Sequence, residues 1–503
     1  MATINLNDLR VLNANNLLDS FNSNDETSVA QAYMFIGRPV AWPTGENNPP
    51  TPTNNYREFY NTYDQMLSLK RINDIDAYSM IRRNRWSGGI TYDVYKDNYS
   101  NQNKSFSGQS NLYEANYYVI TSSNYVYVCL DNNGNSPSTV EPQDLNEDAF
   151  YTSDGYQWLK IYSLTATDIS ERSTQDFIPI IIDPANNVTA GIDGAVYTVQ
   201  IASPGTGYTA NPVGGQNALP YYYCHIRGDG AGAVARVKVG LERIQSIEVV
   251  RNGGGYTEAT LDFTPNNVYA SLVDLDASIN GLNPGGNNNF RSTAIVSPPG
   301  GWGSDIPRQL GGTKVGIFST IGSADFDFIE DVTFRQIGII QNPSFPPSTQ
   351  ANAATLSASF AISYENLAGA GFQIGETISQ SVEIDGVIKT AKGQIVNNNS
   401  GNGVVKYIQD PNLHRDLVDQ NLYRFADLAS QSNAVVTIVG ETSGTTANPD
   451  TTRNGTFLDL HFVSGYADPE ITQYSGYLTY LTNQPPITRQ NNQSERISLI
   501  VGY

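Results

Sequence analysis

The alternation of apolar and polar positions predicts a chain made mainly of β-strands. From Ile90 onward, apolar or alternating runs are separated by turn-forming stretches such as DNNGNSPST and TSDG. The clearest predicted strands are TYDVY, NYYVITSSNYVYVCL and YQWLKIYSL. Cys129 lies in the second of these runs, where we expect it to be a small buried hydrophobe.

Helical spacing is confined to the region before residue 85. Residues 13–21 predict a short amphipathic helix with Leu17, Leu18 and Phe21 on one side, and residues 56–70 predict a second helix. The apolar stripe of the second helix consists of Phe59, Tyr63, Met66 and Leu67. A stripe at this spacing is typical of a side that faces a core.

Residues 185–324 are rich in glycine and contain an internal repeat. VYTVQIASPGTGYT and IQSIEVVRNGGGYT each lead from an apolar strand through glycines to Gly-Tyr-Thr, with Tyr208 and Tyr256 in equivalent places. HIRGDGAGAVARVKV, between them, predicts a hairpin. We interpret the glycines as turn positions with positive φ, because neither motif runs into the helical pattern that a phosphate-binding loop requires.

A second island of short strands and polar turns covers residues 346–460 and predicts a small barrel or sandwich. An apolar strand with a proline-terminated exit, TFRQIGIIQNPSFPP, lies between the two islands. The chain ends on two β-prone runs on either side of Pro485 and Pro486. Here GYLTYL predicts a strand, NQPPI a rigid exit that cannot donate to a ladder, and RISLIVGY a last strand paired in a sheet.

Composition narrows the classes of function. The chain has 29 Lys and Arg against 49 Asp and Glu, a net charge of −20, so contact with nucleic acid is disfavoured. We attribute this charge mainly to solubility, with a basic partner surface as the alternative. The two cysteines, Cys129 and Cys224, are too few for a disulfide framework and fit a reducing cytoplasm. Neither a signal peptide nor a membrane span is predicted.

No motif predicts catalysis, a cofactor or a metal site. His225, His414 and His461 lie far apart, and G-x-S-x-G is absent. DNNGNS at 131–136 and DLDASING at 274–281 do not match a calcium loop and predict turns. The densest acidic cluster, DFDFIED, places Asp325 and Asp327 on one strand face. We interpret that face as solvated rather than as a pair of catalytic carboxylates.

RRNRW is unusual in an acidic chain. Arg82, Arg83, Arg85 and Trp86 could bind phosphate, stack on a partner or neutralise a buried carboxylate. Because Arg and Trp are enriched at interface hot spots, we interpret the stretch as an anchor within the protein or between subunits. Contact with nucleic acid is the alternative.

Seven segments, taken in order along the chain, form a recognisable pattern. They are FIGRPVAWP (35–43), PPTPTNN (49–55), MIRRNRW (80–86), YVYVCLD (125–131), SDGYQWLKIYSL (153–164) with DFIPII (176–181), FRQIGIIQNP (334–343) and SGYLTYLTNQPPI (475–487). Together they resemble the baseplate wedge subunit family of T-even-type contractile-tailed phages, the gene product 8 type.

The resemblance covers a wedge body at 1–184, 325–345 and 461–503, about half of the chain, and leaves the domains at 185–324 and 346–460 as insertions in surface loops. It implies a mainly β protein, with a layered β-sandwich body, a few short helices near the N-terminus and two small inserted β domains. Candidate residues for a subunit interface or a fold anchor are Trp42, Arg82, Arg83, Arg85, Trp86, Trp158, Arg335, Pro485 and Pro486.

The resemblance also implies a function. A member of this family would be a non-enzymatic homodimer in the virion tail baseplate, assembled in the host bacterial cytoplasm. It would bind other wedge subunits and move as a rigid body before sheath contraction. Neither nucleic acid nor a membrane would be a partner.

The alternative hypothesis is a host receptor- or glycan-binding tail protein whose islands are carbohydrate-binding modules. It rests on the Gly-Tyr-Thr repeats, since exposed rings of Tyr208 and Tyr256 could stack on a host-surface glycan. A third hypothesis, a polysaccharide depolymerase, needs converging acids in the segment 325–331.

Overall fold

A computed structural model shows a mainly β protein, with 42% of residues in strands and 11% in helices, which confirms the predicted fold class. Its sheets are antiparallel, and they include half-barrels and a six-stranded barrel. The structure describes residues 6–21, 31–145, 148–181, 191–210, 219–286, 289–322, 328, 330–346, 348–426, 436–490 and 492–503.

The chain forms two compact units, each built from segments that are far apart in sequence. Unit 1 comprises residues 1–15, 78–316 and 500–503, and unit 2 comprises residues 16–77 and 317–499. Four elements carry the chain from one unit to the other: α1 (Leu6–Phe21), β3 (Ala77–Arg82), β16 (Lys314–Ile321) and β31 (Glu495–Gly502). The predicted domain boundaries near residues 184, 324, 345 and 460 stay predictions.

An aromatic core in unit 1 surrounds a sheet of order β4-β5-β7-β6. Its strands are β4 (Tyr118–Ile120), β5 (Tyr125–Asn132), β6 (Phe150–Tyr151) and β7 (Tyr156–Ser163). Trp158 is fully buried in this core and stacks on Tyr156 with ring centroids 5.5 Å apart. The predicted strands around Cys129 and Trp158 are confirmed, and Cys129 is buried. Residues 91–95 are instead a non-strand segment, because their buried side chains pack on the core without joining a ladder.

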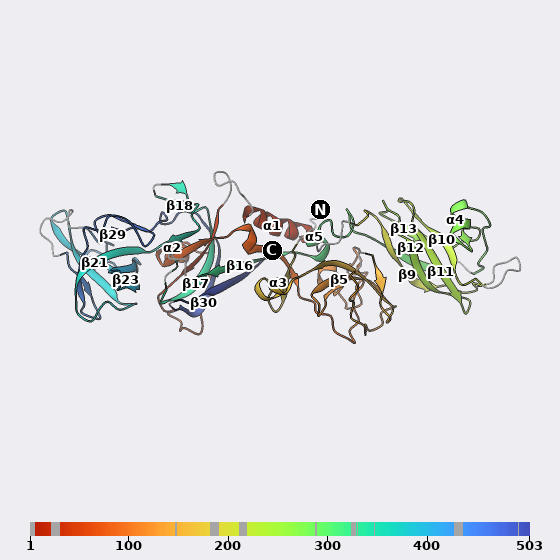
Figure 1. Ribbon diagram of the computed structural model, residues 1–503, viewed down its shortest axis with the longest axis horizontal. Helices are drawn as coiled ribbons and strands as arrows, with labels where there is room; N and C mark the ends of the chain where they lie inside the picture. The colour runs from red at the N-terminus through yellow and green to blue at the C-terminus, as the bar shows by residue number, and fades with distance from the viewer. Residues whose placement is uncertain are drawn as a thin grey trace. The chain divides into compact units, whose positions relative to one another are not determined.

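A second core in unit 1 contains the glycine-rich repeat. One sheet has the order β12-β11-β10-β13 with β14 also on β10, and another pairs β15 with β9. Their bounds are β9 (Val196–Pro204), β10 (Tyr222–Gly228), β11 (Val234–Gly240), β12 (Arg243–Arg251), β13 (Ala259–Leu261), β14 (Val268–Tyr269) and β15 (Phe290–Val296). The repeated strands, β9 and β12, lie side by side (Figure 1), and the predicted hairpin is confirmed as β10–β11.

The two Gly-Tyr-Thr motifs close turns onto this core. Gly205 and Gly253 have φ of 64° and 61°, as the turn interpretation predicted. Tyr208 and Tyr256 are only 5% and 3% exposed, and the Tyr256 hydroxyl donates to the carbonyl oxygen of Ile226 at 2.9 Å. The expectation that these tyrosines are exposed to sugars is therefore wrong, since the turns fold both rings inward.

Unit 2 contains a five-stranded sheet of order β20-β2-β1-β17-β30. Its strands are β1 (Ala32–Gly37), β2 (Met66–Arg71), β17 (Val332–Gln341), β20 (Thr355–Ser357) and β30 (Tyr477–Arg489). The predicted helix over 56–70 is wrong in its second half, because the chain leaves the helix at Gln65 and pairs with β1. The helix itself, α2 (Tyr56–Asp64), begins at an Asn55 cap whose side chain accepts from the Glu58 amide.

The double proline lies inside a strand rather than at an exit. β30 continues through Pro485 and Pro486, so the prediction that NQPPI ends the strand is wrong. Two features accommodate the prolines. β30 is at the edge of its sheet, and its register with β17 shifts between Phe334 and Gln336, which leaves extra residues on β30.

The second predicted island folds into a barrel. The strands pair in the order β24-β23-β22-β25-β26-β21, and the pairing of β24 with β21 closes them into a ring. β29 pairs with β21 at Ala361 and Ile362. The bounds are β21 (Phe360–Ala368), β22 (Thr377–Ile384), β23 (Val387–Asn399), β24 (Val404–Ile408), β25 (Ile438–Gly440), β26 (Thr446–Pro449) and β29 (Tyr466–Ala467). Two small ribbons pair β18 (Ser344–Phe345) with β19 (Thr349–Gln350) and β27 (Gly455–Phe457) with β28 (Leu460–Phe462).

The helices are short, and several were not predicted. α1 begins seven residues before the expected start at residue 13. In the part of the chain that the structure describes, three further α-helices lie beyond residue 85: α3 (Ala166–Glu171), α4 (Leu272–Ala277) and α5 (Ile306–Leu310). Each is six residues long or less, too short to show an apolar period in the sequence.

The C-terminal run forms β31, as predicted. It lies at the edge of a sheet of order β31-β16-β3-β8, where β8 is Phe177–Pro179. The Tyr503 amide donates to the carbonyl oxygen of Thr313 at 3.2 Å, so pairing with the β16 side extends to the last residue. Ile497 and Leu499 are the buried apolar residues of this strand.

Deleting residues 496–503 should destabilise the protein markedly. Burial of Ile497 and Leu499 contributes about 1.5–3 kcal/mol each, so we expect a loss of roughly 3–6 kcal/mol. Thermal unfolding followed by circular dichroism measures the effect. Deleting only residues 502–503 is the control and should change the melting temperature little. Identical melting of the longer deletion and the full chain would show that β31 contributes nothing.

Candidate functional site

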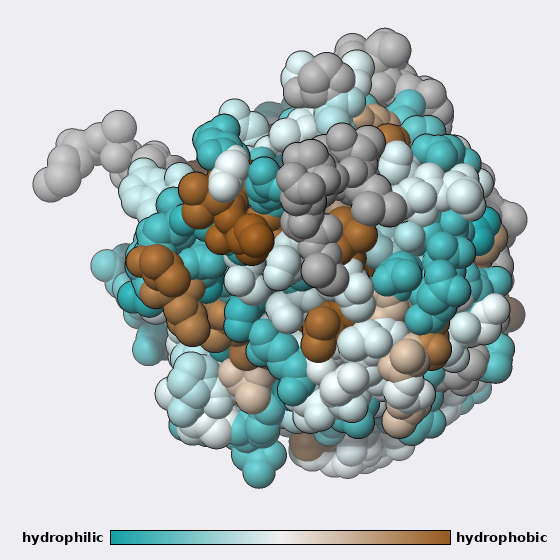
Figure 2. Space-filling view, turned by 90° about the vertical axis from the view of Figure 1, so that its left-hand side faces the viewer, coloured by the Kyte–Doolittle hydropathy of each residue, from teal (hydrophilic) through white to brown (hydrophobic). Residues whose placement is uncertain are grey.

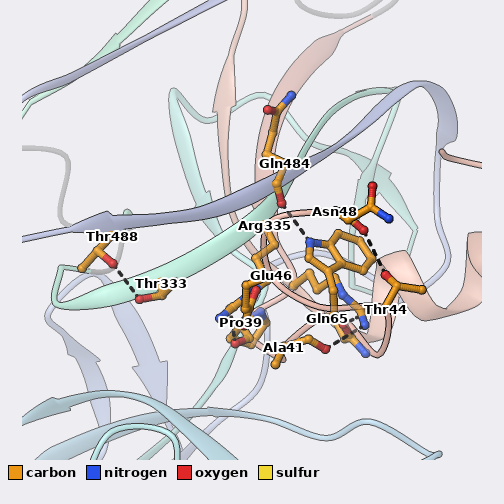
Figure 3. Close-up of polar contacts among 12 residues, drawn as sticks. Pro39, Ala41, Thr44, Glu46, Asn48, Gln65, Thr333, Arg335, Gln484 and Thr488 are labelled. Atoms are coloured by element: carbon orange, nitrogen blue, oxygen red, sulfur yellow. Dashed lines mark hydrogen bonds and ion pairs between the residues drawn. The ribbon is translucent and has the colours of Figure 1, made fainter. Parts of the chain in front are cut away.

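The best-defined polar cluster in unit 2 centres on Arg335, a buried residue of β17 (Figure 3). Its guanidinium donates to both carboxylate oxygens of Glu46, at 2.7 and 2.8 Å, and to the carbonyl oxygen of Pro39 at 2.6 Å. A bidentate guanidinium–carboxylate pair fixes both distance and orientation. The loop after β1 is thereby attached to β17, an inner strand of the sheet.

Trp42 attaches the same loop to the double-proline strand. Its indole N–H donates to the carbonyl oxygen of Gln484 at 2.8 Å, directly before Pro485 and Pro486 (Figure 3). The Arg38 guanidinium lies 4.0 Å from the Trp42 ring centroid, a cation–π contact. The carbonyl before the prolines thus has a donor, although the prolines themselves have no N–H to offer.

A third set of contacts completes this lock. Gln336 donates to the side chain of Asn483 at 2.9 Å, and Asn483 donates to the carbonyl oxygen of Pro50 at 2.8 Å. The contacts around Arg335, Trp42 and Asn483 therefore join four of the seven resembling segments within unit 2. We call this set of contacts the loop lock. None of its groups is arranged as a nucleophile with a base, so its geometry is that of a fold anchor.

The other predicted anchor, Arg82–Trp86, lies in unit 1. Its backbone is held on both sides, since the Arg83 amide donates to the carbonyl oxygen of Asp176 at 2.8 Å and the Trp86 amide to that of Ile120 at 3.0 Å. The Trp86 ring packs on the aromatic core, and its N–H donates to Ser138 at 3.2 Å. The stretch is therefore presented on a fixed backbone.

The arginines of this stretch face the solvent to different extents. Arg82 and Arg85 are exposed, and neither makes an ion pair among the described residues. Arg83 is half-buried and donates to the carbonyl oxygen of Thr174 at 2.9 Å. Burial, and then the nearby charge of Arg85, lower its pKa. Of the three proposed roles, neutralising a buried carboxylate has no support from the described contacts.

The groups considered for catalysis or metal binding do not converge. His414 is buried and accepts from the Asp410 amide at 2.8 Å, while His461 is exposed in β28 and His225 lies in unit 1. No three His, Cys, Asp or Glu side chains among the described residues are grouped to hold a metal ion. Asp325 and Asp327 lie outside the described residues.

A large cleft in unit 1 was not predicted from the sequence. It is a cleft of about 740 Å³ in unit 1, lined by residues from the 94–106 segment, the ends of β5 and β6, and the strands β9, β12 and β15. Its lining comes from many short pieces of chain, of which the sequence predicts the turn after β5 and the two repeated strands but not their meeting in one cleft. No local motif could have revealed a site of this kind.

Hydrophobic side chains also reach the surface of unit 2. Figure 2 shows them as separate brown patches among polar residues. The hairpin between β22 and β23 exposes Ile384, Val387 and Ile388 around a turn at Asp385 and Gly386, both with positive φ. Such patches are typical of sites that contact other proteins.

Comparison of the chain with protein-family models gave no match. Comparison with curated proteins gave no match either. Among the described residues, no helix is both long enough and apolar enough to cross a membrane.

Replacing Arg335 with Met should weaken the loop lock. The change keeps a long side chain but leaves the Pro39 carbonyl without its donor, and we expect a loss of roughly 1–3 kcal/mol. Urea unfolding measures the difference. Arg57→Met, at an exposed position of α2, is the matched control and should be neutral. Equal stability of both variants would contradict the role of Arg335.

Asp131 in the cleft should make stability depend on pH. Burial raises the pKa of its carboxyl, so the folded state holds the proton more tightly than the unfolded chain. The contribution of the protonated Asp131 carboxyl to the unfolding free energy is complete below the unfolded-state pKa. This contribution is lost as pH rises through the raised folded-state pKa. Asp131→Asn keeps an acceptor for the Asn133 amide. We expect the unfolding free energy of this variant, relative to that of the original protein, to increase between pH 4 and pH 7. An unchanged difference would contradict the burial of the Asp131 carboxyl.

Proposed function

We propose that the chain is a non-enzymatic structural subunit of a contractile phage tail baseplate wedge. The observation that carries the proposal is the ordered set of seven segments that resemble the gene product 8 type of wedge subunit. The proposal places the protein in the virion tail baseplate, after assembly in the host bacterial cytoplasm. Its partners are a second copy of the chain and other wedge subunits.

The arrangement of the resembling segments supports this proposal. Residues from four segments meet in the loop lock, although they are separated by hundreds of positions in the chain. In unit 1, the RRNRW stretch contacts the DFIPII segment through the Arg83 amide and the Asp176 carbonyl. If the chain keeps the body of that family, we expect the segments that resemble the family to contact one another.

The exposed side chains are suited to subunit contacts. Arg82 and Arg85 offer guanidinium groups that no described acid neutralises, beside a fixed Trp86. The chain carries an excess of acids, so another copy or an acidic neighbour would complement them. The apolar β22–β23 hairpin adds a hydrophobic contact of the kind found at interface centres.

The thiols give no support to an enzymatic role. Cys129 and Cys224 are both buried, and burial raises the pKa of each thiol above its ordinary value. A reactive cysteine requires the opposite environment, one that is exposed and lowers the pKa.

Native mass spectrometry of the purified chain tests the assembly proposal. We expect a dimer, and we expect the double variant Arg82→Glu and Arg85→Glu to weaken the dimer or its binding to a neighbouring subunit at least about tenfold. The single variant Arg57→Glu, at an exposed position, is a control with half the charge change per chain. The double variant Arg57→Glu and Arg243→Glu has the same charge change as the test variant. A protein that stays monomeric and binds no other tail subunit would contradict the proposal.

A further inference from the structure

The cleft in unit 1 has the size of a ligand site. Its volume of about 740 Å³ falls within the range of roughly 300–1,000 Å³ that small-molecule sites occupy. One wall comes from the core around β5 and β7, and the other comes from the glycine-rich strands. The mouth is open enough to leave two aromatic rings, Phe106 and Tyr151, 58% and 45% exposed.

The first wall holds these rings on fixed supports. Phe106 sits in a turn whose next residue, Ser107, donates through its amide and its hydroxyl to the fully buried Asp93, at 2.9 and 2.6 Å. Tyr151 belongs to β6 and pairs with Gln157 of β7. Rigid aromatic side chains lose little conformational entropy on binding, which favours recognition.

The second wall is made by β9, β12 and β15, and it is joined to the first. Tyr197 of β9 packs on the aromatic core, and its carbonyl oxygen accepts from the side chain of Gln157 at 3.4 Å. Gln200, Gln245 and Ser246 line the cleft from this wall. The cleft therefore combines aromatic faces on one side with amide and hydroxyl groups on the other.

The charges that line the cleft balance. Lys96 and Lys104 are matched in number by Asp131 and Glu248, and Glu248 is paired with Arg236 at 2.6 Å. Once Arg236 is counted with Glu248, the cleft keeps at most one excess positive charge, which is a weak basis for binding phosphate or another strongly anionic ligand. A lining of this polarity is equally unsuited to a lipid chain.

Lys96 and Asp131 give the cleft complementary hydrogen-bonding groups. Both line it, and Lys96 makes no ion pair among the described residues. An ammonium only donates, and a carboxylate only accepts. A hydroxyl group does both, so neighbouring hydroxyls can satisfy the two side chains together.

We propose that this cleft binds a neutral oligosaccharide, with Phe106 and Tyr151 against the apolar faces of sugar rings and Lys96 and Asp131 bonded to ring hydroxyls. This activity goes beyond the proposed structural role and does not depend on it. It also differs from the hypothesis based on Tyr208 and Tyr256, since those rings are buried elsewhere in unit 1. Here the glycine-rich strands provide one wall of the site rather than the stacking rings.

Saturation-transfer NMR and calorimetry on the full chain test this proposal. The probes are neutral trisaccharides: maltotriose, cellotriose, mannotriose and tri-N-acetylchitotriose. We expect saturable binding of at least one of them, weakened at least about tenfold by combining Phe106→Ala and Tyr151→Ala. The matched control combines Tyr56→Ala and Tyr477→Ala, which removes two still more exposed rings from unit 2 and should leave affinity unchanged.

Several results would overturn the proposal. The proposal is wrong if none of the four sugars shows saturable binding, or if the control variant loses as much affinity as the test variant. It is also wrong if the protein binds a neutral tripeptide such as Gly-Tyr-Gly more tightly than every sugar. Asp131→Asn adds an independent readout: it should weaken sugar binding although the melting temperature at neutral pH does not fall. Dimer formation, measured in parallel, is expected to be unchanged in all these variants, so failure here leaves the assembly proposal to its own test.

Discussion

The fold of unit 2 depends on the pairing of β17 with two strands from opposite ends of the chain. β17 pairs with β1 on one side and with β30 on the other, so it joins segments about 300 and 140 residues away. A strand in this place is buried on both edges, yet it carries Arg335. That charge is tolerated because Glu46 and Pro39 supply acceptors at hydrogen-bonding distance. The loop after β1 supplies these acceptors, and the bulge at the double proline lies opposite Arg335.

The class of fold and the strongest strands could be predicted because they depend on local patterns. The strands at Cys129 and Trp158 have apolar or alternating runs, and the repeat strands β9 and β12 are followed by glycine turns. The errors arose where a distant partner decided the outcome. Met66 and Leu67 fit a helical stripe, but they belong to β2, which pairs with a strand on each side.

The candidate sites divide in the same way. Arg335, Trp42 and the prolines were noted from the sequence as individual residues, but their mutual contacts depend on pairings that local spacing does not encode. Asp131 gave no signal beyond a turn, and no pattern in the sequence marked Tyr151. Their neighbours in the cleft come from β9 and β12, and only the packing of two cores brings these surfaces together.

A β protein with surface arginines on a hydrogen-bonded backbone and a polar cleft is suited to contacts with neighbours. The central claim is that it does so as a wedge subunit, and a cryo-EM reconstruction of an intact phage particle that carries this chain tests the claim most directly. The account predicts density for the chain in the six-fold baseplate, with the surface of Arg82 and Trp86 against another subunit. Density found only at a fibre tip, or none in the particle, would contradict it.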